Sequence, residues 1–134
     1  MKTPEEIKAE GNRKADIRNR LLLTGDHEYV GTVSDEGLTP VRDILLGSKG
    51  PYDVWYHVDE NNVPAYVGRF KCVTGFSDGV AEVKDGLGWF HIYPNGSAVY
   101  AERFSSYDTD ARKKALQAAL EESKELKHNG HAVS

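Results

Sequence analysis

The chain has little cysteine and no long apolar run. Cys72 is the single cysteine in 134 residues, so no disulfide can form within one chain, which argues against a disulfide-stapled secreted fold. The longest apolar stretch is about four residues, whereas a membrane-spanning helix needs ~20, and the first residues lack the apolar segment of a secretory signal. These absences predict a soluble, cytoplasmic protein with no membrane partner.

Sequence motifs that carry chemistry are also scarce. Gly86 and Gly88 come nearest to a glycine-rich phosphate loop, but neither a helix nor a Lys-Ser/Thr pair follows them. Cys72 lies within an expected strand and has no triad partner nearby in the sequence. His128 and His131 have the spacing of a metal clip, but a mobile chain end is the simpler interpretation. We expect no catalytic residues, no metal site and no cofactor, so a non-enzymatic protein is favoured over an enzyme.

The chain is mildly acidic, with a net charge of −4, 39% apolar residues and 28% charged residues. This composition is that of an ordinary globular domain, and the acidic balance disfavours a nucleic-acid backbone as partner. Basic residues near the start are interspersed with acids, as in the pair of Glu10 with Lys14, which is typical of a solvated helix face. We therefore expect no nucleic-acid partner.

Two segments have helical patterns within a single domain that spans residues 1–134. The first helix is expected over 4–23, with Thr3 as N-cap and a proline at the first helical position. The second is expected over 108–127, where alanines and leucines recur at three- and four-residue spacing. The last residues, 128–134, are expected to form a flexible tail.

Between these helices, residues 28–104 consist of short β-branched and aromatic runs separated by Gly, Pro, Asn and Asp. Such runs indicate strands joined by tight turns, and Asn95-Gly96 favours a two-residue hairpin turn. The expected strands are 28–33, 39–46, 54–58, 64–74, 80–84, 88–93 and 98–104. The sequence therefore predicts an α+β fold, in which a central antiparallel β-hairpin region is flanked by an N-terminal and a C-terminal helix.

An internal repeat with a period of 34 residues lies within this β region. Six residue types recur without a gap at that offset: Trp55 and Trp89, His57 and His91, Asn61 and Asn95, Tyr66 and Tyr100, Arg69 and Arg103, Phe70 and Phe104. A fixed period in this range marks units that bury one face by stacking on their neighbours. We predict tandem β-hairpin units that each end in Tyr-x-x-Arg-Phe, and residues 36–41 are a candidate for a third, degenerate unit.

A longer motif begins before the second of these hairpins: Phe76-Ser-Asp-Gly-Val-Ala-Glu-Val83 is followed by Gly88-Trp-Phe-His-Ile92 and the Asn95-Gly96 turn, with a partial first copy before it. This motif resembles a repeat of the WG-repeat family, which is widespread and mostly bacterial. The resemblance covers residues 54–104. The family dipeptide runs Trp then Gly, whereas this chain has Gly then Trp, and the first copy has Val54 where a glycine is expected. The resemblance implies a binding or scaffolding module and names no reaction.

Eight residues of the two units are candidates for a binding surface: Trp55, His57, Tyr66, Arg69, Trp89, His91, Tyr100 and Arg103. The arginines and tyrosines could hold a carboxylate, a phosphate or a partner side chain, but cross-strand pairing with acids such as Glu82 or Glu102 is favoured. The histidines could meet and bind a metal, but bonds to a neighbouring strand are favoured, because no further ligand recurs at the same period. The tryptophans are expected to pack in the core or between units, with partner contact as the minority alternative.

These features predict a non-enzymatic β-repeat module that binds a protein or peptide partner through an exposed strand face or edge. Self-association through the last hairpin or the C-terminal helix is an extension of this hypothesis. The alternative is a small-molecule sensor or small enzyme that uses the repeated His, Arg and Tyr positions, and it requires one cleft that unites His57, His91, Arg69 and Arg103. A third hypothesis is a stand-alone remnant of a longer repeat array.

Overall fold

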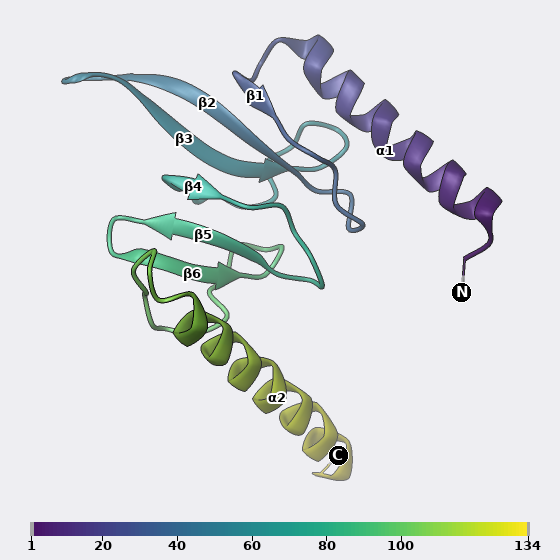
Figure 1. Cartoon of the computed structure of the whole chain (residues 1–134), viewed down its shortest axis with the longest axis vertical. Helices are drawn as coiled ribbons and strands as arrows, with labels where there is room; N and C mark the ends of the chain where they lie inside the picture. Colours follow the sequence, from purple (N-terminus) through teal and green to yellow (C-terminus); the bar gives the residue numbers. More distant parts are fainter. Residues whose placement is uncertain (1, 134) are drawn as a thin grey trace.

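The structure is a computed structural model that describes residues 2–133, with side chains described as far as residue 122. It contains two helices and two three-stranded antiparallel sheets, so the expected α+β class is confirmed (Figure 1). The elements in chain order are α1 (Pro4–Thr24), β1 (Tyr29–Val30), β2 (Thr39–Gly47), β3 (Gly50–Val58), β4 (Cys72–Val73), β5 (Ala81–Asp85), β6 (Gly88–Ile92) and α2 (Thr109–Val133). The sheets have the orders β1-β2-β3 and β4-β5-β6, and α1 lies beside the first sheet and α2 beside the second.

Helix α1 begins at the residue that its sequence predicts and ends at Thr24, one residue after the predicted end. The Thr3 hydroxyl accepts a hydrogen bond from the Glu6 N–H over 3.2 Å, and the Glu6 carboxylate accepts one from the Thr3 N–H over 3.4 Å. This capping box satisfies two N–H groups that would otherwise lack partners at the helix start. Gly25 ends the helix in the left-handed conformation (φ +70°), and its N–H donates to the Leu22 carbonyl.

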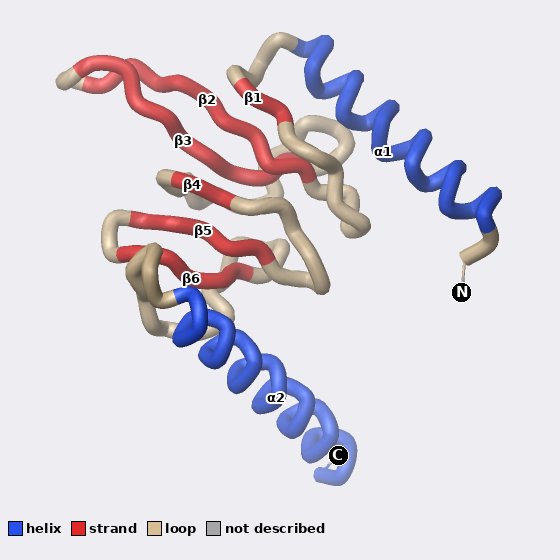
Figure 2. Tube along the Cα trace, viewed as in Figure 1, coloured by secondary structure: helices blue, strands red, loops and turns tan. Residues whose placement is uncertain are grey.

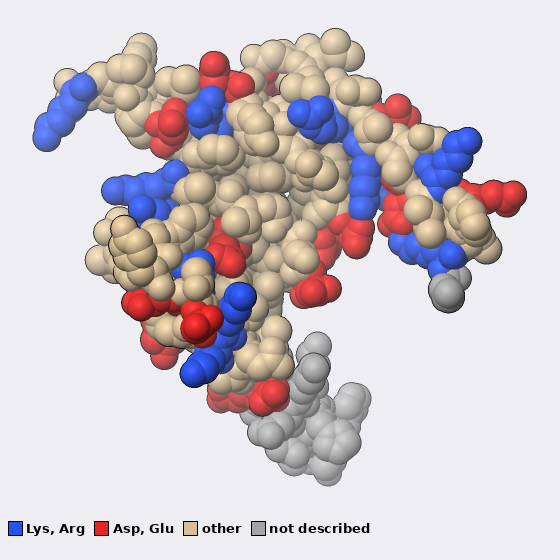
Figure 3. Space-filling model, viewed as in Figure 1, with Lys and Arg blue, Asp and Glu red and all other residues tan. Residues whose placement is uncertain are grey.

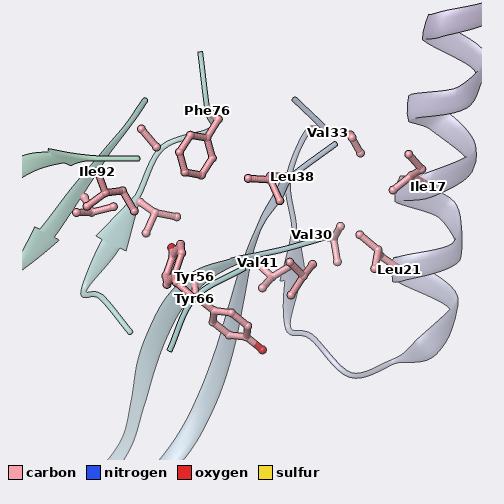
Figure 4. Close-up of a cluster of buried hydrophobic side chains, with 14 of the residues drawn as sticks. Ile17, Leu21, Val30, Val33, Leu38, Val41, Tyr56, Tyr66, Phe76 and Ile92 are labelled. Atoms are coloured by element: carbon pink, nitrogen blue, oxygen red, sulfur yellow. The ribbon is translucent and has the colours of Figure 1, made fainter. Parts of the chain in front are cut away.

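Two buried side chains and one arginine fix α1 to the first sheet. Ile17 and Leu21 are each 1% exposed and lie near Val30 (Figure 4). The Arg18 guanidinium donates to the carbonyls of Gly31 over 3.1 Å and Val30 over 3.2 Å. Because the helix buries so few residues and has a glycine in its interior, these tertiary contacts rather than helix propensity hold it in place.

Strands β2 and β3 form a long hairpin whose outer half leaves the body of the protein. The two strands are paired along their whole length, but burial falls toward the turn: Val41 is 0% exposed, whereas Leu46 is 87% exposed. The tube drawing shows this half of the hairpin extending past the rest of the first sheet (Figure 2). We refer to residues 44–53 as the β2–β3 arm.

Four of the expected strands, 39–46, 54–58, 80–84 and 88–93, are present as β2, β3, β5 and β6. The strand expected over 28–33 is shortened to β1, since Gly31 faces Pro40, which has no N–H with which to continue the ladder.

Two other expected strands, 64–74 and 98–104, are not continuous. Each of these segments touches the preceding strand at two isolated bridges: Val58 with Pro64 and Trp55 with Phe70, then Ile92 with Ala98 and Trp89 with Phe104. Between its bridges each segment leaves the sheet, because it turns a tyrosine inward toward a histidine on that strand. Only β4 continues the first segment as a regular strand.

One buried apolar cluster joins α1 and both sheets (Figure 4). Val58 of the first sheet and Val83 and Ile92 of the second are each 0% exposed. The rings of Phe70 and Phe90 meet edge to face with centroids 5.9 Å apart, a favourable geometry for an aromatic pair. The two sheets therefore share a core.

Helix α2 packs against β6 and begins one residue after the start that the sequence predicts. The Arg112 guanidinium, in its first turn, donates to the Glu82 carboxylate of β5 over 2.9 Å. The helix runs on to Val133, past the end expected at residue 127 and through most of the segment expected as a flexible tail over 128–134, and the side chains of His128 and His131 fall outside the described ones. Within residues 2–133, neither helix is both long and apolar enough to cross a membrane.

Candidate binding surfaces

We name residues 54–70 the first unit and residues 88–104 the second unit. Each unit holds a buried histidine against a tyrosine hydroxyl. Nδ1 of His57 lies 2.6 Å from the Tyr66 hydroxyl, and Nδ1 of His91 lies 2.6 Å from the Tyr100 hydroxyl. Nε2 of His57 lies 2.8 Å from the carbonyl oxygen of Thr74. Because a carbonyl only accepts, Nε2 carries the proton and Nδ1 accepts from Tyr66. His57 therefore bonds a neighbouring segment, as the sequence favours.

Burial fixes the protonation state of this first pair. His57 is 0% exposed, and loss of solvent lowers its pKa to about 4, although the bond to the Thr74 carbonyl opposes the shift. Burial also raises the pKa of the Tyr66 hydroxyl above its ordinary value. At neutral pH the imidazole is uncharged and the phenol is protonated, which suits a structural hydrogen bond.

Arg69 holds the loop that follows β3. Its guanidinium lies 3.8 Å from the centroid of the Tyr56 ring, a stacked position that favours a cation. The same group donates to the carbonyls of Tyr66, Val67 and Gly68 over 3.0 to 3.3 Å. The Arg69 guanidinium therefore makes its contacts within the first unit, where it holds a loop against a strand.

Arg103 repeats this arrangement in the second unit. It lies 3.4 Å from the centroid of the Phe90 ring and donates to the carbonyls of the two residues before it. Its Nε also donates to the Asp85 carboxylate over 3.0 Å. The acid that pairs with Arg103 is therefore Asp85, in place of Glu82 or Glu102, for which the sequence favoured this role.

Trp55 and Trp89 are half-buried and lie at the margins of the two sheets. The Trp55 ring lies 5.6 Å from the Tyr29 ring, and the Trp89 indole N–H donates to the Ser106 hydroxyl over 2.9 Å. The Arg112 guanidinium lies 5.4 Å from the Trp89 ring. Both tryptophans thus pack against neighbours within the chain.

A cavity of about 330 Å³ lies between the second sheet and α2. His91 and Glu82 line one side, with Nε2 and Oε1 3.7 Å apart, and Leu116 and Leu120 line the other. Burial lowers the pKa of His91, whereas the charge of Glu82 raises it. Nε2 of His91 thus lies near the Glu82 carboxylate, whereas Nε2 of His57 bonds the Thr74 carbonyl.

The four side chains that the small-molecule hypothesis requires in one cleft are not united by this cavity. His91 lines it, but His57, Arg69 and Arg103 do not. The two histidines instead face their own tyrosines. Among the described residues, no group of three or more His, Cys, Asp or Glu side chains could hold a metal ion.

The β2–β3 arm is a surface that the sequence pattern did not single out. Leu45 and Tyr52 face each other across the hairpin and are 43% and 50% exposed, and Ile44 and Leu46, on the opposite face, are 47% and 87% exposed. A half-buried strand alternates apolar and polar residues, so three consecutive apolar residues give apolar side chains on both faces. The run of Ile44, Leu45 and Leu46 was the signal in the sequence from which this surface could have been predicted. The space-filling view shows mostly uncharged surface along the projection (Figure 3).

No protein-family model, curated protein or solved structure matches the chain.

Proposed function

We propose that this chain is a non-enzymatic module that binds a protein or peptide partner through the β2–β3 arm. The observation that carries the proposal is the exposure of Ile44, Leu45, Leu46 and Tyr52 on the two faces of one projecting hairpin. Soluble proteins seldom expose a contiguous group of large apolar side chains without a binding role. The β2 edge of this projecting ribbon is also open, and open strand edges recruit strands from partners.

The base of the arm is held in one position, which favours binding. The Asp43 carboxylate accepts a hydrogen bond from the Tyr56 hydroxyl over 2.6 Å and lies 2.6 Å from Nδ1 of His27. Nε2 of His27 lies 2.6 Å from the side-chain oxygen of Asn62. An arm that is ordered before it meets a partner loses less conformational freedom on binding.

We further propose that the two units are tandem copies of one 34-residue repeat, related to the WG-repeat family, and that they form the scaffold from which the arm projects. Support comes from contacts that recur at this offset, such as the His57 and Tyr66 pair with the His91 and Tyr100 pair. Their rings and guanidinium groups bond within each unit, so in this proposal they stabilise the scaffold rather than recognise the partner.

The test compares three purified versions of the chain: wild type, Leu46→Asp and Leu87→Asp. Leu87 is 83% exposed in the turn before β6, so it is a matched control at a distance from the arm. Proteins captured from host lysate by the wild type would be purified and titrated against each version. We expect Leu87→Asp to bind like wild type and Leu46→Asp to bind at least about tenfold more weakly, as for loss of an apolar anchor. Equal affinity for all three versions would contradict the proposal.

A second candidate function is small-molecule binding, favoured by the cavity beside His91. Its lining combines polar groups on β5 and β6 with apolar side chains on α2, as ligand sites do. A compound library screened by thermal shift tests this function. A compound that raises the melting temperature of wild type but not of His91→Gln would support it, and a screen without such a compound would count against it.

A further inference from the structure

We infer that the partner of the arm is a second copy of this chain, whose β2 strand pairs antiparallel with the first β2 strand across a two-fold axis. This inference rests on the proposed function of the arm as a binding surface. Three features support it: the backbone groups along the β2 edge of the arm are free, those along the β3 edge are blocked, and two β2 edges are complementary to each other.

The β2 edge of the arm is open. The carbonyls of Pro40 and Arg42 accept hydrogen bonds over 2.8 and 2.9 Å from the segment that contains β1, so even-numbered residues of β2 direct their backbone groups to that side. Ile44 and Leu46 follow the same alternation beyond the reach of β1, which pairs only with positions 41 and 42. Within residues 2–133, no hydrogen bond reaches Ile44 or Leu46 from that side.

The opposite edge of the arm, along β3, is blocked. Trp55 exchanges backbone hydrogen bonds of 2.9 Å with Phe70, so odd-numbered residues of β3 face outward there. The next outward positions are Asp53, which carries a charge, and Pro51, which has no N–H. Charge and proline are the devices that prevent strand addition at an edge. A partner strand is therefore directed to β2.

The free edge of β2 is complementary to itself in a register centred on Leu45. With Leu45 on the two-fold axis, Ile44 of each copy lies opposite Leu46 of the other, and the two residues exchange backbone hydrogen bonds. The cross-strand pairs that residues 44–46 form in this register are all apolar, which stabilises the pairing. A register centred on Ile44 would instead place Leu46 of the second copy against Arg42, whose edge β1 already occupies.

The charges at the ends of the free edge also match. In the register centred on Leu45, the β2–β3 turn of one copy, which follows residue 47, meets the start of β1 of the other copy, because β1 already pairs with Arg42. Glu28 lies beside Arg42, because its N–H donates to the Arg42 carbonyl over 2.9 Å. Lys49, in the β2–β3 turn, therefore approaches Glu28 of the other copy, and both side chains are exposed. Two-fold symmetry repeats this opposite-charge contact at both ends of the interface.

The first experiment is cross-linking of the full chain carrying Cys72→Ser, to remove the native thiol, with either Leu45→Cys or Leu87→Cys. Directly opposite residues of an antiparallel pair have Cβ atoms about 4.5–5.5 Å apart, within reach of a short thiol cross-linker. We expect a covalent dimer from Leu45→Cys and none from Leu87→Cys. Equal cross-linking of the two variants would overturn the inference.

The second experiment is sedimentation of the full chain over a range of concentrations. We expect a species of twice the 14.9 kDa chain mass, at least about tenfold weaker self-association in Lys49→Glu, and recovery when Lys49→Glu is combined with Glu28→Lys. Ile44→Pro, which removes an outward N–H and keeps the hairpin ladder, should also weaken the dimer. A dimer that none of these changes weakens would overturn the inference.

The two proposals fail in distinguishable ways. A chain that is monomeric at every concentration but binds a different purified protein through Leu46 would overturn the two-fold pairing and leave the proposed function of the arm intact. A monomeric chain whose affinity for every purified partner is unchanged by Leu46→Asp would overturn both proposals.

Discussion

The Tyr66 hydroxyl donates a hydrogen bond to Nδ1 of His57 over 2.6 Å, and the histidine is fully buried. Tyr66→Phe keeps the ring but leaves this acceptor without a donor, which costs about 1–3 kcal/mol. We expect the free energy of unfolding, measured by urea titration, to fall by that amount. Tyr107→Phe is the control, since Tyr107 is 95% exposed, and a loss no larger than that of the control would contradict the buried role of Tyr66.

The same histidine gives stability a defined pH dependence. Burial lowers the pKa of His57 to about 4 in the folded chain, against 6.5 for an ordinary histidine. Above pH 6.5 the ring is neutral in both states and contributes no pH dependence. Between pH 6.5 and about 4 the unfolded chain binds a proton that the folded chain excludes, so stability falls by up to about 1.4 kcal/mol per pH unit.

His57→Gln isolates this contribution, because a glutamine can bond both neighbours but does not titrate. We expect wild type to lose more unfolding free energy than His57→Gln when the pH is lowered through this window. His91 also has a lowered pKa through burial, but it titrates in both proteins and its effect cancels in the difference. Parallel pH profiles for the two proteins would show that His57 is not protected from protonation.

Local signals in the sequence were sufficient for some elements of the fold but not for segments whose paths depend on residues distant in the sequence. Thr3 and Gly25 act through neighbours within a few residues, so the limits of α1 could be predicted. The segment 64–74 could not, since its path depends on Tyr66 reaching a histidine on another strand. The exposure of the β2–β3 arm depends on how far β1 extends along β2. The residue pattern of β2 alone does not predict the length of β1.

The candidate site residues show the same limit. The sequence indicated that histidine, tyrosine and arginine recur together, and the structure brings His57 to Tyr66 and His91 to Tyr100. Whether such side chains face solvent or the core is decided by tertiary packing, which period and residue type do not encode. Their role as a binding surface stays a prediction.

The two stacked arginines are expected to contribute more to stability than exposed arginines do. Arg103→Lys keeps the charge but loses the planar contact with the Phe90 ring and the parallel bonds to backbone carbonyls. We expect a loss of about 1–2 kcal/mol, measured by chemical unfolding. Arg13→Lys is the control, because Arg13 pairs with Glu60 at the surface, and such pairs contribute roughly 0–1 kcal/mol. Equal losses for the two variants would contradict a special role for stacking.

Substitution of two glycines by alanine should change stability in opposite directions. A Cβ atom on Gly88 would lie 2.7 Å from the Phe104 carbonyl oxygen, and the φ of +140° disfavours any side chain, so Gly88→Ala should destabilise by at least about 1–3 kcal/mol. Gly11 lies inside α1, and a Cβ atom added there would meet open space, with nothing within 4 Å. Gly11→Ala should therefore stabilise by about 0.5–1 kcal/mol. Thermal melting of both variants checks this, and a tolerated Gly88→Ala would mean that the Trp89 and Phe104 bridge is looser than its 2.7 Å hydrogen bond indicates.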